Sequence, residues 1–531
     1  DTASIQNVLN AANPGDRVVL QSGTYKISDR LYAPKGVSFE GQGKANTILE
    51  NLPGFSGSMM WIYTGSSRVR EMTVKTTTKM TSYGVLTGRG YNVSPIPAGL
   101  IFEDLRIISD SEDAGGNYLG NTGISCGDSL DIYVRNCEFE GSKALGLAKC
   151  RQVFITNNVC DGNLTLAATS NKGSTLAQLN SCRELDFSNN ILRSKDRDNA
   201  LWARRGYVVQ NPNGHSMDCY LAENTLTDIM PYHAPGIDQN TGENILLECG
   251  HKQFLESPLS VAGKTLTFTD QGFATDELAT DDRPGWNSGE RESSVLYVVK
   301  GPGVGQWRRI VANTSNSLTV DRPWDVTPTT ASAILIHMGC TRYAFYKNTI
   351  TADVDDKGNG IPDQFDYDAR SHIAATGIQT YGTVVDIVAA KNVISGFRSG
   401  IMPWGFINRG LPAAGFYMND NTISNCHAGL EIVIKFNKNR QPAVDNAPFI
   451  LNFNARDNVI NGCNQGVWYD GKRGSYRIND GSWTALSVIE HNTIQHCYDD
   501  TSDNSPGGIY LGVHQGETLV RKNTLFDTDI G

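Results

Sequence analysis

One short pattern recurs five times along residues 391–531 of this chain: Asn392-Val-Ile, Asn421-Thr-Ile, Asn458-Val-Ile, Asn492-Thr-Ile and Asn523-Thr-Leu. The intervals between these Asn residues vary, at 29, 37, 34 and 31 residues, whereas the offsets inside the pattern are constant. An apolar residue stands three positions before every Asn, and Phe or Cys stands five positions after each of the first four. Constant offsets with variable intervals indicate one stacked structural unit with loops of different lengths.

The unit itself has the features of short β-strands. Its apolar residues alternate with a period of two and many are β-branched, which favours strand over helix. A unit this small cannot bury its own apolar face, so neighbouring units must provide the core. Asn suits the bend between strands because it bonds nearby backbone and tolerates the left-handed region, and stacked Asn side chains can bond to one another. We therefore predict an all-β parallel β-helix.

Weaker copies extend the pattern toward the N-terminus. They begin at Asn136, Asn158, Asn190, Asn224 and Asn348. The interval from Asn136 to Asn158 is 22 residues, close to the shortest coil that three strands and three bends can make. Counting these copies and the strands before them predicts roughly a dozen coils.

Composition limits the classes of partner and cofactor. The chain has 531 residues, 54 Gly, 19% charged residues and a net charge of −10. This charge argues against nucleic acid or a bare anionic membrane as partner. We find no membrane-length apolar run and no signal peptide, and we expect no organic cofactor.

The 11 Cys residues lack the spacing of a small disulfide-rich domain, and none forms a CxxC pair. Six stand near the ends of predicted strands: Cys137, Cys160, Cys182, Cys426, Cys463 and Cys497. We expect these thiols to be reduced and to fill the core as small apolar groups.

The N-terminal residues carry a more specific signal. An amphipathic stretch, Ser4-Ile-Gln-Asn-Val-Leu-Asn-Ala-Ala, predicts a short helix. Pro14-Gly-Asp-Arg-Val-Val-Leu, Gly23-Thr-Tyr and Lys35-Gly-Val-Ser-Phe-Glu-Gly-Gln-Gly follow it. This succession resembles the opening of the pectate-lyase-like right-handed parallel β-helix superfamily. The resemblance implies a helix that caps the solenoid. It leaves the activity open, because the superfamily includes lyases, hydrolases, epimerases, esterases and phage tailspikes.

The pattern is lost inside the 124-residue interval between Asn224 and Asn348. Short strand-like segments such as Thr265-Leu-Thr-Phe-Thr and Ser317-Leu-Thr-Val stand there instead. We predict a cap and coils over residues 1–250, an inserted β module over 251–338, and further coils over 339–531. The module's Trp286, Trp307 and Trp324 either form its core, which we favour, or bind sugar.

Acidic residues are dense beside the insertion: Asp218, Asp228, Asp238, Glu243 and Glu248. Hydrolysis of a glycosidic bond needs two carboxyl groups, separated by roughly 5 Å or 7–9 Å. Asp238 follows an apparent strand start at Gly236-Ile237, and Glu248 ends an apolar strand. We expect Asp238, Glu243 or Glu248 to be catalytic, with Glu431 and Asp470 as a second candidate pair. The alternative is ordinary turn chemistry, which places acids at many bends.

Aromatic and basic residues occur at similar phase in neighbouring coils, where they predict a strip that binds sugar. The candidates are Trp202, Arg204, Arg205, Tyr381, Trp404 and Trp468. His233 could hold a substrate hydroxyl, although a single histidine of this kind is more often a satisfied surface residue.

The run Asp353-Val-Asp-Asp-Lys-Gly-Asn-Gly-Ile-Pro-Asp-Gln-Phe-Asp resembles calcium loops of thrombospondin-type repeats and, more loosely, of EF-hands. This resemblance implies a structural Ca²⁺ site with ligands at alternating positions. Lys357 stands at the third position, where a ligand oxygen is expected, and it argues against the site. The implied ligands are Asp355, Asn359, the carbonyl of Ile361, Asp363 and Asp366.

Three functions remain open. We favour a glycoside hydrolase with paired carboxylates, acting on an oligo- or polysaccharide in a groove. A polysaccharide lyase needs a base and a group that neutralises a uronate, with Arg204, Arg205 and Lys149 as candidates. The third is a non-catalytic adhesin or tailspike that binds glycans. We expect a secreted or surface-associated protein of bacterial or phage origin, as a monomer or homotrimer.

Overall fold

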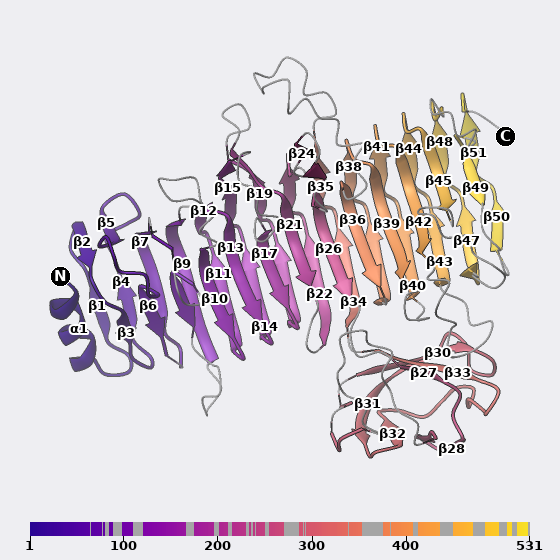
Figure 1. Ribbon diagram of the computed structural model, residues 1–531, viewed down its shortest axis with the longest axis horizontal. Coiled ribbons are helices and arrows are strands. Elements are labelled where there is room, and N and C mark those ends of the chain that lie inside the picture. Colours follow the sequence, from indigo (N-terminus) through magenta and orange to yellow (C-terminus); the bar gives the residue numbers. More distant parts are fainter. Residues whose placement is uncertain are drawn as a thin grey trace.

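The chain coils around one long axis and is built almost entirely of β-strands (Figure 1). The computed structural model describes residues 1–63, 65–76, 78–79, 84–88, 98–109, 121–165, 175–195, 201–210, 215–229, 233–234, 237–238, 241–249, 254–269, 286–289, 291–292, 294–337, 339–352, 375–382, 384–406, 413–435, 450–470, 484–498, 507–511 and 518–528. No helix in this part of the chain has the length and hydropathy needed to cross a membrane.

A 13-stranded sheet, called here the front sheet, receives one strand from each coil. Its strands pair in parallel, which confirms the stacked-coil prediction. They are β3 (Leu31–Ala33), β6 (Met60–Ile62), β8 (Leu86–Gly88), β10 (Thr122–Gly127), β13 (Lys143–Ala148), β17 (Thr175–Asn180), β21 (Arg205–Gln210), β26 (Glu243–Cys249), β36 (Thr376–Gly382), β39 (Ser399–Phe406), β42 (Ala428–Lys435), β45 (Gln465–Asp470) and β49 (Ile509–Leu511).

The other coil strands form a 27-stranded parallel sheet, called here the back sheet. The long strand β9 pairs with both β11 and β12, so two sides of the coil belong to one sheet. The strands are β1 (Arg17–Val19), β2 (Gly23–Ile27), β4 (Ser38–Glu40), β5 (Thr47–Asn51), β7 (Arg68–Thr76), β9 (Ala98–Ser109), β11 (Leu130–Arg135), β12 (Glu138–Gly141), β14 (Arg151–Thr156), β15 (Val159–Gly162), β18 (Arg183–Ser188), β19 (Ile191–Ser194), β22 (Ser216–Ala222), β23 (Thr225–Thr227), β34 (Cys340–Tyr346), β35 (Thr349–Thr351), β37 (Val384–Ala390), β38 (Val393–Ser395), β40 (Ala413–Asn419), β41 (Thr422–Ser424), β43 (Ile450–Arg456), β44 (Val459–Asn461), β46 (Thr484–Ala485), β47 (Ser487–Glu490), β48 (Thr493–Gln495), β50 (Thr518–Arg521) and β51 (Thr524–Phe526).

Helix α1 (Thr2–Ala11) covers the N-terminal end of the coils, as predicted. Ile5 and Leu9 lie one turn apart on one helix face and are buried against the first coil. The Asp1 carboxylate accepts the backbone N–H of Lys26 at 2.8 Å, which fixes the helix to β2.

Nine Asn residues form a continuous ladder along one corner of the coils. The Nδ2 of each donates to the Oδ1 of the next at 2.9–3.1 Å, and that Oδ1 also accepts the backbone N–H of the Asn before it. The ladder comprises Asn158, Asn190, Asn224, Asn348, Asn392, Asn421, Asn458, Asn492 and Asn523. These bonds pair the buried polar groups of the bend, which would be costly to leave unpaired.

The left-handed backbone belongs to the residue before each ladder Asn, and our prediction had assigned it to the Asn itself. Lys391, for example, has φ 57°. Asn136 is such a residue, with φ 55°, and Cys137 occupies the ladder position, where its N–H donates to Asn158 Oδ1 at 3.0 Å. The predicted copy at Asn136 was therefore wrong by one residue, and this coil is 21 residues long.

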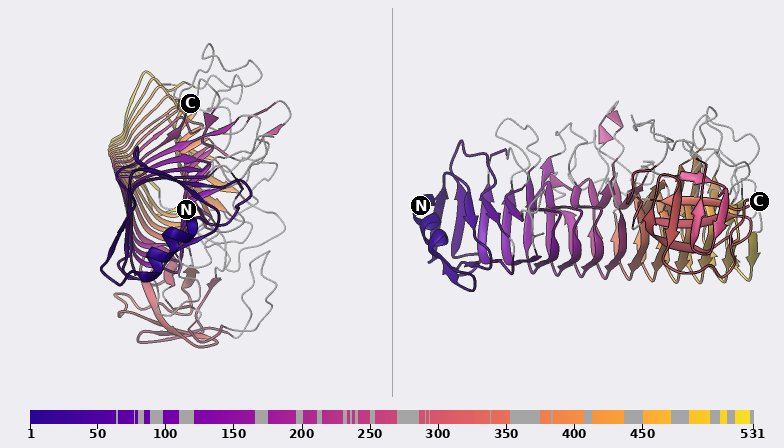
Figure 2. Two further views of the ribbon diagram at one scale, coloured as in Figure 1. Left: turned by 90° about the vertical axis from the view of Figure 1, so that its left-hand side faces the viewer. Right: turned by 90° about the horizontal axis from the view of Figure 1, so that it is seen from below.

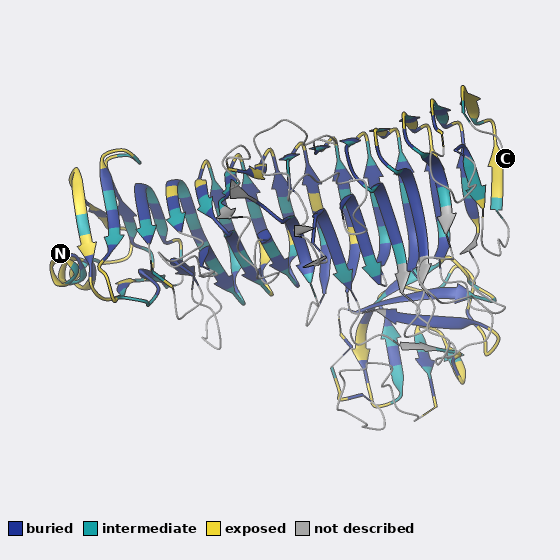
Figure 3. Cartoon of the chain, turned by 45° about the horizontal axis from the view of Figure 1, so that its top comes forward, coloured by how far each residue is buried: buried dark blue, intermediate teal, exposed yellow. Residues whose placement is uncertain are grey.

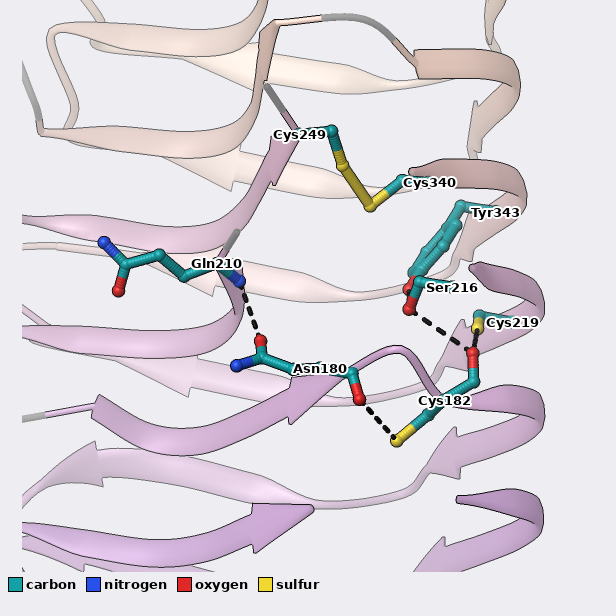
Figure 4. Close-up of a disulfide and its surroundings, with 8 residues drawn as sticks. All are labelled: Asn180, Cys182, Gln210, Ser216, Cys219, Cys249, Cys340 and Tyr343. Atoms are coloured by element: carbon teal, nitrogen blue, oxygen red, sulfur yellow. Dashed lines mark hydrogen bonds between the residues drawn. A yellow bond between two sulfur atoms is a disulfide. The ribbon is translucent and has the colours of Figure 1, made fainter. Parts of the chain in front are cut away.

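The positions predicted to form the core are buried in the inner coils. Ile394, Ile423, Ile460 and Ile494 are fully enclosed, whereas Leu525 in the last described coil is 39% exposed. The six Cys residues named above are buried free thiols, as predicted. Two others, Cys249 and Cys340, form a disulfide that the sequence analysis did not predict (Figure 4). This bond joins the end of β26 to the start of β34, across the insertion.

The inserted segment forms a seven-stranded antiparallel sheet beside the coils (Figures 1 and 2). Its strands are β27 (Phe254–Glu256), β28 (Ser260–Ala262), β29 (Thr265–Thr267), β30 (Val295–Lys300), β31 (Trp307–Asn313), β32 (Ser317–Val320) and β33 (Ala333–His337). Trp286 is buried in the module's own core, with its ring 5.9 Å from Phe268, and Trp324 packs against the same core. Trp307 packs against a second cluster, at the contact between module and coils.

That contact covers one row of the back sheet. Met217, Val385, Ala414 and Leu451 share one register position, with Thr341 between Met217 and Val385, and pack against β30 and β33. These four side chains are buried and lie outside the core cluster of the coils. Figure 3 shows buried strands both in the coils and in the module. The module is therefore docked on the back sheet, and the front sheet is left for other contacts.

Candidate functional site

The outer side of the front sheet gathers six of the predicted site residues in two parallel rows. Adjacent strands place Gln210, Glu248, Tyr381, Trp404, Val433 and Asp470 at one register position, called row A. Two residues earlier on each strand, row B contains Gln178, Val208, Leu246, Gln379, Met402, Glu431, Trp468 and Tyr510. The prediction of a single strip is corrected to two rows, because the residues stand either two or four positions after the Gly at the strand start.

Glu243 begins β26 as a buried ion-paired carboxylate. Its Oε2 lies 2.9 Å from Arg205 Nε on the preceding front-sheet strand. Burial raises the pKa of the Glu243 carboxyl, although the charge and hydrogen bonds of Arg205 act in the opposite direction. Arg204 is also buried, at 3% exposure. The structure thus brings two predicted residues, Arg205 and Glu243, together as an enclosed ion pair.

Glu431 is an enclosed acid of row B. Its side chain is fully buried, and Ser399 Oγ, on the preceding strand, donates a hydrogen bond to its Oε2. Two strands lie between Glu431 on β42 and Glu248 on β26. Glu248 is only partly buried, and Tyr381 follows it in row A. These acids therefore stand in different environments on the same face.

The aromatic residues of the rows contact one another and neighbouring cations. Tyr381 and Trp404 meet edge to face, with ring centroids 5.2 Å apart. The Trp468 ring lies 6.0 Å from His427, also edge to face, and 5.8 Å from the guanidinium of Arg398. All three predicted aromatics are partly exposed, so they present ring surface beside the acids.

Lys143 is a candidate that our sequence analysis missed. It begins β13, and its Nζ donates to the row-B residue Gln178 at 2.7 Å. Burial lowers the pKa of the Lys143 ammonium, which increases the share of neutral amine available as a base. The sequence signal was weak, because a Lys at a strand start is common on solvated surfaces. Only the pairing of β13 with β17 places it on the front sheet.

Asp238, His233 and Trp202 lie away from the rows. His233 and Asp238 pair with each other in a two-stranded antiparallel hairpin of β24 (His233–Ala234) and β25 (Ile237–Asp238), which projects from the coils. Ile237 and Asp238 thus belong to this antiparallel pair, and our assignment of a coil strand start there is wrong. Trp202 belongs to a second ribbon, of β16 (Leu164–Thr165) and β20 (Leu201–Trp202). The structure does not describe these three side chains.

The predicted calcium ligands lie outside the described residues: Asp355, Asn359, Ile361, Asp363 and Asp366. Within the described part of the chain, no group of three or more His, Cys, Asp or Glu side chains is arranged to hold a metal ion. The calcium site accordingly stays a prediction.

Several solved structures are similar to this one. The structure is similar to the A-module of Azotobacter vinelandii mannuronan C-5 epimerase AlgE6, at 12% identity over 99% of this chain and 94% of that chain, with a TM-score of 0.47. It is also similar to tailspike protein 3 of bacteriophage CBA120 (9% identity, 99% and 58% coverage, TM-score 0.43) and to a PL6 alginate lyase (9%, 99% and 83%, 0.42). No family model and no curated protein sequence matches the chain.

The stacked parallel strands and the capping helix of the described residues decide the fold. The chain is a right-handed parallel β-helix. In this β-helix, backbone spacing limits which acids can act together. Glu243 and Glu248 are five residues apart on one strand, and Glu248 and Glu431 are three strands apart, so each pair is separated by roughly 14–17 Å. Glu431 and Asp470 lie one strand and two residues apart, which places their Cα atoms about 8 Å from each other.

Proposed function

We propose that this β-helix binds an oligo- or polysaccharide along the outer side of the front sheet and cleaves its glycosidic bonds. The observation that carries the proposal is the juxtaposition of Glu431, Trp468 and Asp470 on two adjacent strands. Trp468 lies directly opposite Glu431, and Tyr381 and Trp404 continue the aromatic surface over the preceding coils. Aromatic surface beside a few placed polar groups is typical of a sugar site.

In this proposal, Glu431 and Asp470 supply the two carboxyl groups. Their Cα atoms are about 8 Å apart. We assign the pair an inverting mechanism, in which the two carboxyl groups stand roughly 6.5–9.5 Å apart and a water molecule fits between the base and the sugar. The structure does not describe the Asp470 side chain. One carboxyl protonates the departing oxygen, and the other removes a proton from the attacking water. Ser399 orients Glu431 through its hydrogen bond. Glu248 and the rings of row A then position the sugar chain.

Lys143 favours a second candidate, a polysaccharide lyase. A lyase removes the proton next to a uronate carboxyl, and an amine with a lowered pKa is a suitable base for this step. Arg205 is a poor base here because its guanidinium is paired with Glu243. Arg204 is likewise poor, since its side chain is buried and arginine stays protonated. The proposed lyase base therefore moves from these arginines to Lys143.

Incubation with alginate, polygalacturonate and neutral glucans distinguishes these activities. A hydrolase releases reducing ends with no unsaturated sugar, whereas a lyase also produces the ultraviolet absorbance of an unsaturated uronate. Retention on an immobilised glycan with no cleavage would identify a non-catalytic adhesin or tailspike. If the protein neither binds nor cleaves any of these polymers, the proposal fails for these glycan classes.

We also propose an extracellular protein with a structural Ca²⁺ in the loop at 353–366. The Cys249–Cys340 disulfide supports the location, because such bonds persist in oxidising compartments. Calcium binding is tested by titration calorimetry on metal-free protein, with Asp363→Ala as the variant. Equal heats from both proteins would refute the calcium site.

A further inference from the structure

Three aromatic residues gather at the N-terminal end of the front sheet, far from the acids of rows A and B. Tyr32 lies on β3, Trp61 lies opposite it on β6, and Tyr63 follows β6 directly. They will be called the N-terminal platform. Tyr32 is 39% exposed, Trp61 and Tyr63 are partly exposed, and none belongs to the buried core of the coils.

The platform is held in place by neighbouring side chains. The rings of Tyr32 and Tyr63 are nearly parallel, at 16°, with centroids 6.3 Å apart, and Trp61 stands perpendicular to Tyr32 at 5.7 Å. The guanidinium of Arg30 lies 3.6 Å from the centroid of Trp61. Gln6 of helix α1 bonds both the N–H and the carbonyl of Tyr32, at 2.8 and 3.2 Å. Rings fixed in this way lose little conformational entropy when they bind a ligand.

The platform is continuous with row B. Tyr32, Trp61, Thr87, Ser125, Gly146 and Gln178 occupy one register position on six successive strands. Between the platform and Gln178, the row thus consists of small side chains. A chain that lies across the strands would meet the rings at one end, then Thr87, Ser125 and Gly146, and the acids further on. Val208 and Leu246 follow Gln178 in the row and are buried.

We propose that the N-terminal platform is a remote subsite that stacks against pyranose rings of a polysaccharide whose cleaved bond lies further along the front sheet. The polarised C–H bonds on a pyranose face match the negative face of an aromatic ring. Seven strand spacings separate β3 from β26, so the platform lies roughly 34 Å from Glu248. Only a chain longer than this span reaches both. This inference rests on the proposed function and adds a dependence on chain length.

A structural role for the rings is the competing explanation. Capping of the coils is performed by α1, whose Ile5 and Leu9 enter the core, and the platform contributes no side chain to that core. The three rings instead lie on the face that carries the acids. Tyr220 of β22 offers a matched control, because it is 42% exposed and stacks on another aromatic ring, Tyr346, on the back sheet.

Affinity electrophoresis tests the subsite with sodium alginate, polygalacturonate and dextran as probes, each as polymer and as oligosaccharides shorter than the span. We expect Tyr32→Ala and Trp61→Ala to weaken polymer binding about 5- to 10-fold, the loss of one stacking contact, with unchanged binding of oligosaccharides. Tyr220→Ala should match the wild type with both. Circular dichroism establishes that each variant is folded, and the two platform variants serve as checks on one another.

The outcomes separate this inference from the proposed function. Retardation of wild-type protein by a polymer, with unchanged retardation of both platform variants, would overturn the subsite alone. Equal weakening toward polymer and oligosaccharide would also overturn it, since the rings would then act through the fold. If none of the three polymers retards the wild type, the subsite and the proposed function both fail for these glycans. Retardation by alginate and polygalacturonate but not dextran would assign the subsite to uronates.

Discussion

The Asn ladder and row B both run across many successive coils, yet they differ in almost every property. The ladder repeats one residue at nine positions, of which eight are buried, and each of those eight side chains bonds to the next coil. Row B changes its residue at nearly every strand, from aromatic to small polar, apolar, acidic and aromatic again. Both are set by the same parallel pairing.

The contrast separates scaffold from surface. A position that must satisfy the same buried polar groups in every coil accepts only one side chain, and its bonds leave nothing free for a ligand. A position on the outer side of a sheet has no such requirement, so its side chains can differ from coil to coil. In a solenoid, regularity thus indicates stability, and irregularity at a constant register indicates a surface available for binding.

The largest effect is expected at the irregular row. Glu431→Gln and Asp470→Asn should each lower kcat by about 10²–10⁴-fold on a cleaved glycan, because each removes a proton donor or acceptor. Release of reducing ends measures the effect, and unchanged circular dichroism excludes misfolding. Turnover close to wild type in both variants would remove this pair from the mechanism.

The ladder should respond in stability. Asn421→Ala removes a side chain that bonds Asn392, Asn458 and the Ala389 carbonyl inside a buried corner. We expect a loss of about 3–5 kcal/mol in the free energy of unfolding, because several buried groups lose their partners. Guanidinium titration measures it.

Asn523→Ala is the matched control for the ladder. Asn523 ends the ladder and is partly exposed, so water can replace its partners and the loss should be much smaller. Equal losses at Asn421 and Asn523 would contradict the importance of burial at this corner.

The disulfide tests the junction between coils and module. Replacing both Cys249 and Cys340 by Ser should lower the stability by about 2–4 kcal/mol, because the bond closes a long loop in the unfolded chain. In wild-type protein that has been unfolded but not reduced, nine cysteines should react with a thiol reagent. Cys463→Ala should show one reactive thiol fewer, because its disulfide is intact. Eleven reactive thiols would show that the cysteines are all reduced.

We expect Glu40 to make a smaller, pH-dependent contribution to the free energy of unfolding. Burial opposes its ionisation, but hydrogen bonds from Arg17, Arg70 and Ser38 outweigh it and lower the pKa of the carboxyl to about 2. The contribution to stability is therefore present above the ordinary carboxyl pKa of 4.5 and is lost as the pH falls toward 2. Glu40→Gln should cost about 1–2 kcal/mol at pH 7.

Thermal unfolding of wild type and Glu40→Gln across this pH range measures that effect. The difference between the two proteins should shrink as the pH falls from 4.5 toward 2. A difference that stays constant would show that the carboxyl has another role. Glu138→Gln is the control, because its pairing with Lys44 is largely exposed and should contribute little.

The smallest effect separates the two acids of the front sheet. Glu248→Gln should raise KM and reduce kcat/KM by less than about 10-fold, because we assign Glu248 to sugar positioning and not to proton transfer. Steady-state kinetics on the cleaved glycan measures this. A loss of kcat as large as that of Glu431→Gln would return Glu248 to the catalytic role that the sequence first suggested.

Much of the fold could be predicted because its causes are local. The constant offset from Asn392 to Ile394, and from Asn421 to Ile423, requires the same corner in every coil. The one-residue error at Asn136 arose because the ladder position of that coil holds Cys137, and the Asn stands one residue before it. The pairing of Glu138 with Val159 shows this offset. The Cys249–Cys340 bond was not predictable, because the two residues are 91 positions apart.

The site was less predictable, since its residues meet across strands. Asp238 seemed to begin a coil strand, but it lies in a projecting hairpin whose presence depends on the length of the loop between β23 and β26. Lys143 carried no signal until β13 and β17 were paired. Glu431 and Asp470 were recognised as a pair, and their separation became known only from the register of β42 and β45.

The sequence by itself determined that identical corners recur and that a buried apolar row accompanies them, because both follow from interactions within one coil. Tertiary structure decided which coil lies beside which and how far each strand is shifted. Because the loops between coils differ in length, the sequence does not show which residues pair across neighbouring strands. The burial of some side chains also depends on tertiary structure. Val385 and Ala414 lie on the outside of the coils and are covered because the module docks there. The chemistry of a solenoid surface is therefore set by stacking, which only the assembled coils define.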